Sequence, residues 1–248
     1  MAKAKYRNRR VIGFLGALAV LIGLVISNPA SYEAIYPPAE AETADVPVQA
    51  TGFEHSNLLA SEVLERIEIK GRAPKTGYSR DEFYKNWPII NGCSLRQRII
   101  KREVGDNAIL GDNQCDVIGG EFDEPYTGSH LVFTEKSDFS QHIQIDHIVT
   151  LSDAWQKGAQ YMDADTRYAI ATDPLNLIAA DASANQQKSD GDAATWLPPN
   201  KAFRCQYVAR QVSVKYKYGL WVTEAEHDAI QRVLEACPNE PAVGITEP

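Results

Sequence analysis

The chain has 248 residues, of which 44% are hydrophobic and 23% are charged, with 13 prolines and 16 glycines. This composition excludes collagen, a coiled coil and a wholly disordered chain, and it suits one or two globular domains. The formal net charge of −8 is unevenly distributed, because residues 1–32 hold five basic residues and no acidic one. The acidic remainder excludes a general polyanion binder, since that affinity comes from Lys and Arg side chains that neutralise phosphates. Any binding of nucleic acid must therefore occur at a local site.

The basic N-terminus leads directly into an apolar stretch at residues 11–26. A cationic segment before such a run is typical of an export signal or a membrane anchor, and we assign residues 1–27 to this class. Asn28-Pro29-Ala30 matches a cleavage site poorly, so removal of the segment and its retention as an anchor both stay open. Either form predicts a protein that is secreted or anchored to the outer face of the cytoplasmic membrane, and that contacts the membrane only through this segment.

The rest of the chain divides into a linker, one domain and a short tail. Residues 28–55 contain four prolines among Ala, Glu and Thr, which predicts a disordered linker. We place the globular domain at residues 56–238 and the tail at residues 239–248. The domain is long enough to bury a sizeable core.

Four cysteines, Cys93, Cys115, Cys205 and Cys237, all lie in the part of the chain that would be exported. No Cys-x-x-Cys or Cys/His spacing indicates a zinc site, and an exported protein favours disulfides. We favour the pairs Cys93–Cys115 and Cys205–Cys237 because each pair lies within one local unit. Each would contribute about 3–4 kcal/mol through loop closure. The other connectivities and free thiols stay open.

The first half of the domain is predicted to mix short helices with a hairpin. Apolar residues have helical spacing over residues 58–67, and Ser79 with Glu82 forms a capping-box pattern at the start of a short helix. A further helix is expected over residues 94–104. Two strands, at residues 115–122 and 130–133, are joined by a turn-rich segment as a hairpin.

The second half is predicted to place two strands among helices. A strand with period-two alternation covers residues 143–149, and a helical pattern covers residues 152–171 until Asp173-Pro174 ends it. The expected elements that follow are a strand at 175–179, a helix at 183–188, a long helix from Asn200 to about Tyr218, and a last helix from Thr223 to Cys237. This order indicates an α+β domain rather than a repeated βαβ pattern.

The dipeptide Asp146-His147, at the end of the 143–149 strand, combines two groups that phosphodiester hydrolysis needs. A histidine can take the proton of an attacking water near neutral pH. A carboxylate can hold a hard cation that neutralises the charge that develops on the phosphate oxygens. Alternation along the strand directs the two side chains to opposite faces.

The following segment adds two asparagines and a lysine at fixed intervals. Asn176 precedes Asn185 by nine residues, and Lys188 follows Asn185 by three. With Asp146-His147, this pattern resembles the HNH nuclease motif, or ββα-metal fold, in which one strand carries Asp-His, the next carries Asn and the following helix carries a third motif residue. The resemblance implies a ββα-metal (HNH) core with an additional hairpin and flanking helices, stapled by disulfides.

Wider segments resemble exported bacterial HNH endonuclease-like proteins, which share their domain with the C-terminal part of GmrSD-type restriction enzymes. The resemblance covers roughly residues 56–238, and the segments that carry it are Gly77-Tyr-Ser-Arg80, Asp123-Glu-Pro-Tyr-Thr-Gly128, Gln144 to Ala159, Asp173-Pro-Leu-Asn-Leu177, Ala184-Asn-Gln-Gln-Lys188 and Ala193 to Lys201. Thr150 departs from the family pattern, because many family members have proline at this position. The departure affects only the exit of the chain from the strand.

The resemblance implies a role for each motif residue. His147 is expected to be the general base, and Asp146 and Asn185 are expected to ligate one Mg²⁺ or Mn²⁺ ion. Asn176 is expected to serve the catalytic site by fixing the loop between the strands. Lys188, one helical turn from Asn185, is a candidate contact to substrate phosphate. The third motif position is Asn185 rather than histidine, which favours a hard metal such as Mg²⁺ over Zn²⁺.

Three functions remain open at this stage. The first is a metal-dependent endonuclease that acts on DNA, with RNA as a second polymer, at low sequence specificity outside the cytoplasm. The second is a catalytically inactive interaction domain of HNH fold at the cell envelope, which the acidic composition favours because an efficient DNase presents a positive groove. The third is a hydrolase of another phosphodiester polymer. Whether an immunity protein is a partner stays open.

Overall fold

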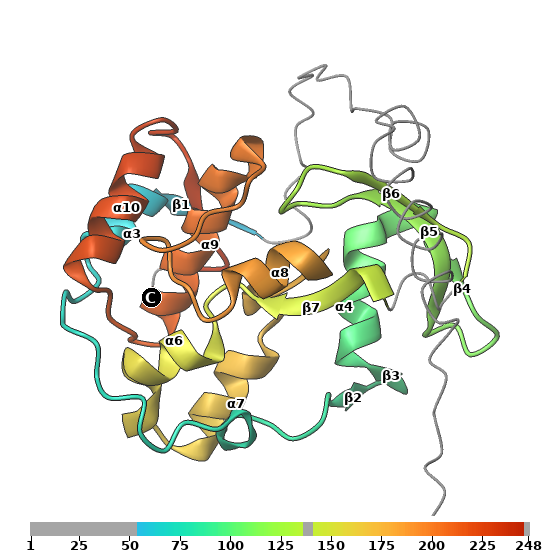
Figure 1. The fold of residues 1–248 in the computed structure, drawn as a ribbon, viewed down its shortest axis with the longest axis horizontal. Coiled ribbons are helices and arrows are strands. Elements are labelled where there is room, and N and C mark those ends of the chain that lie inside the picture. Colours follow the sequence, from blue (N-terminus) through green and yellow to red (C-terminus); the bar gives the residue numbers. More distant parts are fainter. Residues whose placement is uncertain (1–53, 136–140, 246–248) are drawn as a thin grey trace, which may run out of the picture. The chain divides into compact units, whose positions relative to one another are not determined.

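The computed structural model describes residues 54–135 and 141–245 (Figure 1). The predicted export segment and nearly all of the predicted linker lie outside these residues, and both assignments stay predictions. Within the described ranges, no helix is long and apolar enough to cross a membrane.

Two antiparallel strands and the helix after them form the unit that carries the motif residues. Strand β7 (Ile143–His147) pairs with β8 (Leu177–Asp181), so that Asp146 lies opposite Ile178. Helix α8 (Ala182–Lys188) follows β8 without a loop, because the Asp181 side chain caps it by accepting a hydrogen bond from the backbone N–H of Ala184. Figure 1 shows β7 between α8 and α4, and both helices contact it.

The connection from β7 to β8 differs from the single helix predicted over residues 152–171. It consists of α6 (Leu151–Gln156), the 3-10 turn η3 (Ala159–Tyr161) and α7 (Ala164–Thr172). Gly158 ends the first helix with a φ of 129°, which side-chain-bearing residues rarely adopt, and Asp163 caps the next one. A 3-10 turn, η4 (Pro174–Asn176), follows α7, so β8 begins at Leu177, two residues later than predicted.

The predicted hairpin is present as part of a three-stranded antiparallel sheet. Strand β5 (Val117–Asp123) pairs with β4 (Ile109–Leu110) on one side and β6 (His130–Phe133) on the other. The helix predicted over residues 94–104 is present as α4 (Leu95–Val104), which Ser94 caps and which packs against β5 and β8. Two short strands, β2 (Ile89–Ile90) and β3 (Cys93–Ser94), and the 3-10 turn η2 (Gly105–Asn107) flank this helix.

The C-terminal helices form the largest part of the core with the start of the domain. The 3-10 turn η5 (Lys201–Phe203) leads into α9 (Arg204–Lys217), and α10 (Glu224–Leu234) follows with Thr223 as its cap. Both helices contact α3 (Ala60–Leu64). Their shared apolar cluster includes Leu64, Val208, Val212 and Ile230, each at most 1% exposed.

Both ends of the predicted domain require correction. Residues 58–67 do not form one helix, because β1 (His55–Leu59) precedes α3. The segment predicted to be a tail contains strand β9 (Pro241–Val243), which pairs with β1 and buries Ala242 and Val243. The pairing with β1 orders this segment, and a short stretch after a helix gives no local sign of such a distant partner.

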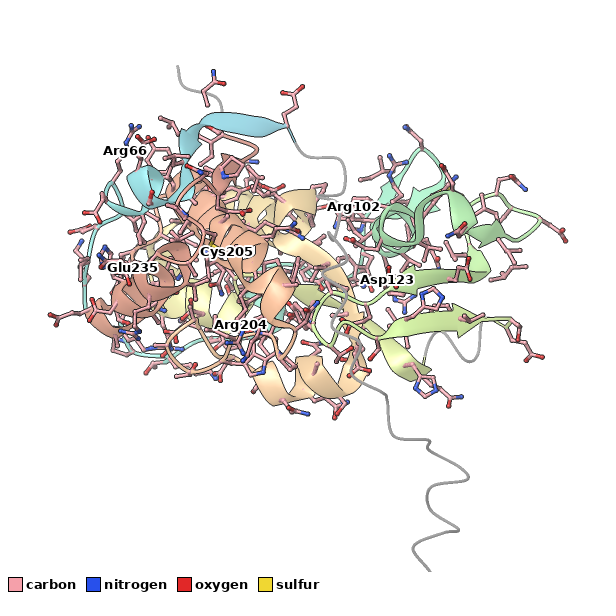
Figure 2. The ribbon with its side chains drawn as sticks, turned by 90° about the horizontal axis from the view of Figure 1, so that it is seen from above. Arg66, Arg102, Asp123, Arg204, Cys205 and Glu235 are labelled. Carbon is pink, nitrogen blue, oxygen red and sulfur yellow. A yellow bond between two sulfur atoms is a disulfide. The ribbon has the colours of Figure 1, made fainter. Side chains whose placement is uncertain are left out.

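The favoured disulfide connectivity is confirmed. Cys93 pairs with Cys115 and Cys205 pairs with Cys237, with Cα–Cα distances of 5.2 Å and 6.3 Å. Figure 2 labels Cys205 on α9, from which the second disulfide reaches the residues just after α10. The order of elements, the small sheets and the two disulfides confirm the α+β class.

Candidate active site

His147, the last residue of β7, is held in one orientation by the backbone of α7. Its Nε2–H donates a hydrogen bond of 3.0 Å to the carbonyl oxygen of Ala171. A carbonyl oxygen can only accept, so Nε2 carries the proton and Nδ1 carries the free lone pair of the neutral ring. This tautomer suits a base that acts through Nδ1.

The surroundings of His147 keep its ring neutral. Burial disfavours the imidazolium and is the main reason that the pKa of His147 falls to about 4, with smaller contributions in the same direction from the charges of Arg80 and Lys188. The Asp146 carboxylate and the hydrogen bond to Ala171 act in the opposite direction and offset part of the effect. At neutral pH the His147 ring is therefore neutral, with its one proton on Nε2.

Two aromatic side chains cover the imidazole. The Trp87 ring stacks at 6.3 Å with an interplanar angle of 10°, and the Tyr84 ring lies at 6.1 Å. Residue His147 is only 5% exposed as a result. The ring thus packs inward, whereas a base at an open strand end would face solvent.

Asp146 lies on the other face of β7, where two buried donors bind one of its oxygens. The Tyr126 hydroxyl and the Lys188 ammonium each donate to Oδ2 at 2.7 Å. Burial first, and the Asp146 charge second, raise the pKa of Tyr126 well above its usual value, so this hydroxyl stays a donor. Both of these hydrogen bonds end on Oδ2, which leaves Oδ1 as the oxygen for a further ligand.

Lys188 does not lie on a solvated helix face, and its predicted contact with substrate phosphate stays a prediction. Its side chain is fully buried, and Nζ donates to Asp146 Oδ2 and to the backbone oxygen of His147, both at 2.7 Å. The last turn of α8 packs against β7 and directs the ammonium inward. In this structure Lys188 neutralises Asp146 rather than offering a charge to solvent.

Asn185 contacts β7 two residues before Asp146. Its Nδ2 donates to the side-chain oxygen of Gln144 at 2.9 Å, so the amide oxygen is the atom turned away from that contact. Gln144 and Asp146 share a face of the strand by period-two alternation. The two predicted metal ligands therefore lie on one side of β7, but each has its own hydrogen-bond partner and no hydrogen bond joins them in the described structure.

Asn176 is fully buried and ties the ends of the β7–β8 connection together. Its Oδ1 accepts from the backbone N–H of Val149 at 2.8 Å, and its Nδ2 donates to the carbonyl oxygens of Val149 and Ile170 at 3.2 Å and 3.0 Å. These bonds fix the backbone just after β7 to the end of α7, close in sequence to Ala171, which binds the His147 ring.

The oxygen donors of the site fit a hard divalent cation in chemical type. Asp146 Oδ1 and the amide oxygen of Asn185 are carboxylate and amide ligands of the kind that Mg²⁺ prefers. Elsewhere in the described ranges, Cys205, Cys237 and Glu240 come close enough to share an ion. That group is unsuited to one, because its two sulfurs are joined in a disulfide and are not thiolates.

Sequence reasoning missed the residues that approach His147 from outside the motif. Arg80, Tyr84 and Trp87 all come from one segment more than fifty residues earlier in the chain. Part of a signal existed, because Gly77-Tyr-Ser-Arg80 is one of the segments that carry the family resemblance. Trp87 has no such signal, and only the folded chain places it against the ring.

Comparison with known proteins identifies the family. The C-terminal domain of GmrSD restriction endonucleases matches residues 96–233, a range that includes Asp146, His147, Asn176, Asn185 and Lys188. The chain belongs to this family. It is also 35% identical over 181 residues to an uncharacterized secreted protein of Arthroderma benhamiae, a match that covers 72% of this chain and 84% of that protein. No solved structure matches.

Membership of the GmrSD C-terminal family confirms the resemblance inferred from the motif segments and makes the chain nuclease-like. The two disulfides fit an extracellular location. Arg80, Tyr84 and Trp87 lie before the matched range.

Proposed function

We propose that this protein is an extracellular endonuclease of the HNH type that hydrolyses phosphodiester bonds, with His147 as the general base. One observation carries the proposal: the Ala171 carbonyl fixes the tautomer that leaves Nδ1 of a neutral imidazole free. Hydrolysis of phosphodiester bonds is also supported by the family, which is named after the GmrSD restriction endonucleases.

In the proposed reaction, Nδ1 of His147 accepts the proton of the water that attacks phosphorus. The Ala171 carbonyl keeps the ring oriented and stabilises the imidazolium as it forms, because a charged donor strengthens this hydrogen bond. Asn176 supports this geometry by fixing the backbone beside the ring. Substrate must reach Nδ1 past the half-buried Trp87 and the Tyr84 ring.

Asp146 and Asn185 are the residues that would hold Mg²⁺ or Mn²⁺. When bound, such an ion supplies charge neutralisation at the phosphate and the leaving oxygen. Two protein ligands are few, which suits Mg²⁺ because it keeps several waters. Lys188 neutralises Asp146 and forms a buried pair that an incoming ion must share or displace.

The proposed substrate is nucleic acid, with DNA first and RNA second, cut with low sequence specificity. Secretion of the relative from Arthroderma benhamiae, the two disulfides and the basic-apolar N-terminus support action outside the cytoplasm.

A second candidate is an inactive interaction domain of the same fold. The observation that favours it is burial, because His147 is only 5% exposed and the Asp146 carboxylate is already paired with Lys188. An interaction domain would bind its partner without cleaving nucleic acid, so the same assay separates the two functions.

The test is cleavage of supercoiled plasmid by the purified full chain with Mg²⁺ or Mn²⁺. We expect nicked and linear products, loss of cleavage with excess chelator, and a rate at least about 100-fold lower for His147→Ala. His130→Ala is the matched control, because this exposed histidine on β6 pairs with Asp123 and should leave the rate unchanged. A folded parent that cuts with neither metal would contradict the proposal.

A further inference from the structure

We propose that Arg80 binds the substrate phosphate at the His147 site and that Tyr84 positions its guanidinium. This inference rests on the proposed function for its reaction, but the binding role of Arg80 can be tested separately. It extends the active site to a segment that lies outside the range matched by the family.

Arg80 is anchored near His147 through an aromatic side chain. It opens the 3-10 turn η1 (Arg80–Glu82), which Ser79 caps by accepting from the backbone N–H of Asp81. Its guanidinium donates to the Tyr84 hydroxyl and lies 5.0 Å from the centre of the Tyr84 ring. That ring in turn lies 6.1 Å from the imidazole of His147. The cation is therefore held on the aromatic side of the base.

The charge of Arg80 is available, unlike those of its neighbours. Arg72 pairs with Asp192, Lys75 pairs with Asp190, and Arg167 pairs with Glu82 of the same turn. Arg80, by contrast, is exposed and forms no ion pair with any carboxylate in residues 54–135 or 141–245. An exposed guanidinium without a counter-anion beside a buried neutral base is a suitable receptor for an anion.

The chemistry of the guanidinium selects phosphate as that anion. Arginine presents five N–H donors in a planar fork that matches phosphate oxygens, and the bond to the Tyr84 hydroxyl uses only one of them. Lys188, the cation predicted for this task, is buried against Asp146. A protein with a net charge of −8 needs such a local cation to bring a polyanion to the base.

The first test measures binding, and it does not depend on cleavage. Affinity of the full chain for a short fluorescein-labelled DNA duplex is measured with chelator present over a series of salt concentrations. We expect Arg80→Ala to weaken binding and to lower the slope of log affinity against log salt by about one. Arg80→Lys should keep the slope but bind less tightly. Arg232→Ala, an exposed arginine on α10, is the matched control and should behave like the parent.

The second test measures cleavage of the same duplex with Mg²⁺. We expect Arg80→Ala to cut about 100-fold more slowly and Tyr84→Phe, which keeps the ring, to cut several-fold more slowly. If the parent binds but does not cut, the nuclease proposal fails, while a lower salt slope for Arg80→Ala still supports phosphate binding. A parent that does not bind the duplex, or an Arg80→Ala variant with the parent's affinity and slope, would overturn the inference.

Discussion

Among the residues that the structure describes, buried lysines occur in two regions, and the first forms a closed charge cluster. Lys157 lies within 2.8 Å of oxygens from Asp153, Asp192 and Glu226, and Lys215 lies 2.9 Å from Asp153 and from Glu226. Every member is at most 2% exposed. We call these five residues the charge cluster.

The second region is the candidate active site, where the ratio of buried cations to their carboxylate partners is different. Lys188 has a single carboxylate partner, Asp146, and completes its bonding with a backbone oxygen of His147. Next to this pair lies a neutral imidazole whose Nδ1 is free. In the charge cluster each lysine forms ion pairs with two or three carboxylates. The candidate active site instead combines one ion pair with a neutral imidazole.

The difference shows which region can carry chemistry. Buried charges that are fully paired with each other stabilise one arrangement of the elements that supply them, but they offer no group to a substrate. The charge cluster joins α6, α9, α10 and the loop after α8 in this way. The candidate active site has a neutral imidazole, two oxygens of the type that Mg²⁺ prefers and a nearby exposed arginine, and so it retains groups that could take part in the proposed reaction.

The largest effect on stability is expected for the charge cluster. Lys157→Met leaves three buried carboxylates with one buried ammonium and the partly exposed Arg72, and it should lower the free energy of unfolding by about 3–5 kcal/mol. Urea denaturation followed by circular dichroism measures this loss. Lys75→Met is the control, since its ion pair with Asp190 is about half exposed and should cost less than about 1 kcal/mol.

A metal ion should distinguish the two regions. Lys188→Met also leaves a buried carboxylate unpaired, but Asp146 belongs to the proposed metal site, so millimolar Mg²⁺ should restore part of the lost stability. The same Mg²⁺ should not rescue Lys157→Met. Thermal unfolding of both variants with Mg²⁺ and with chelator measures the contrast. Equal responses of the two variants would show that Asp146 binds no metal.

A change of pH is expected to have a smaller effect on the free energy of unfolding. The candidate active site and the charge cluster should lose stability over different pH ranges. The pKa of His147 is lowered from 6.5 to about 4, so its neutral form stabilises the fold above pH 6.5, and about 3 kcal/mol is lost as pH falls from 6.5 to 4. Burial raises the pKa of Asp192, but Lys157 and Arg72 outweigh it and lower the value from 3.8 to about 2. The contribution of Asp192 is therefore lost only below pH 3.8.

Unfolding free energies measured between pH 7 and pH 4 test the first window. The parent should lose stability over this range, and His147→Gln should show a flatter profile because its amide does not titrate. A His147→Gln profile that is as steep as that of the parent would assign the loss to another group.

Much of the fold follows from local signals in the sequence. Thr223 caps α10 where its capping pattern predicts, and the hairpin and both disulfides are confirmed. Asn200 caps the 3-10 turn η5 rather than the long helix itself, which begins at Arg204. The split of the 152–171 helix was missed because apolar spacing continues across Gly158, and only its positive φ ends the helix. Strand β9 was missed because it depends on a partner at the opposite end of the domain.

The candidate site is predictable only in part, for a related reason. Motif spacing identifies Asp146, His147, Asn176 and Asn185, since their elements are adjacent in the chain. The inward direction of Lys188 depends on how α8 packs on β7, and the cover of Tyr84 and Trp87 depends on a contact across more than fifty residues. No local pattern encodes either contact.

The protonation state of His147 is the most direct test of the proposed mechanism. Nitrogen NMR of ¹⁵N-histidine-labelled protein at pH 7, assigned with His147→Gln, distinguishes a protonated ring nitrogen from one with a free lone pair. The structure predicts a neutral ring with its proton on Nε2 and a free Nδ1, and this state should persist to about pH 5. A proton on Nδ1, or an imidazolium at pH 7, would contradict His147 as the general base.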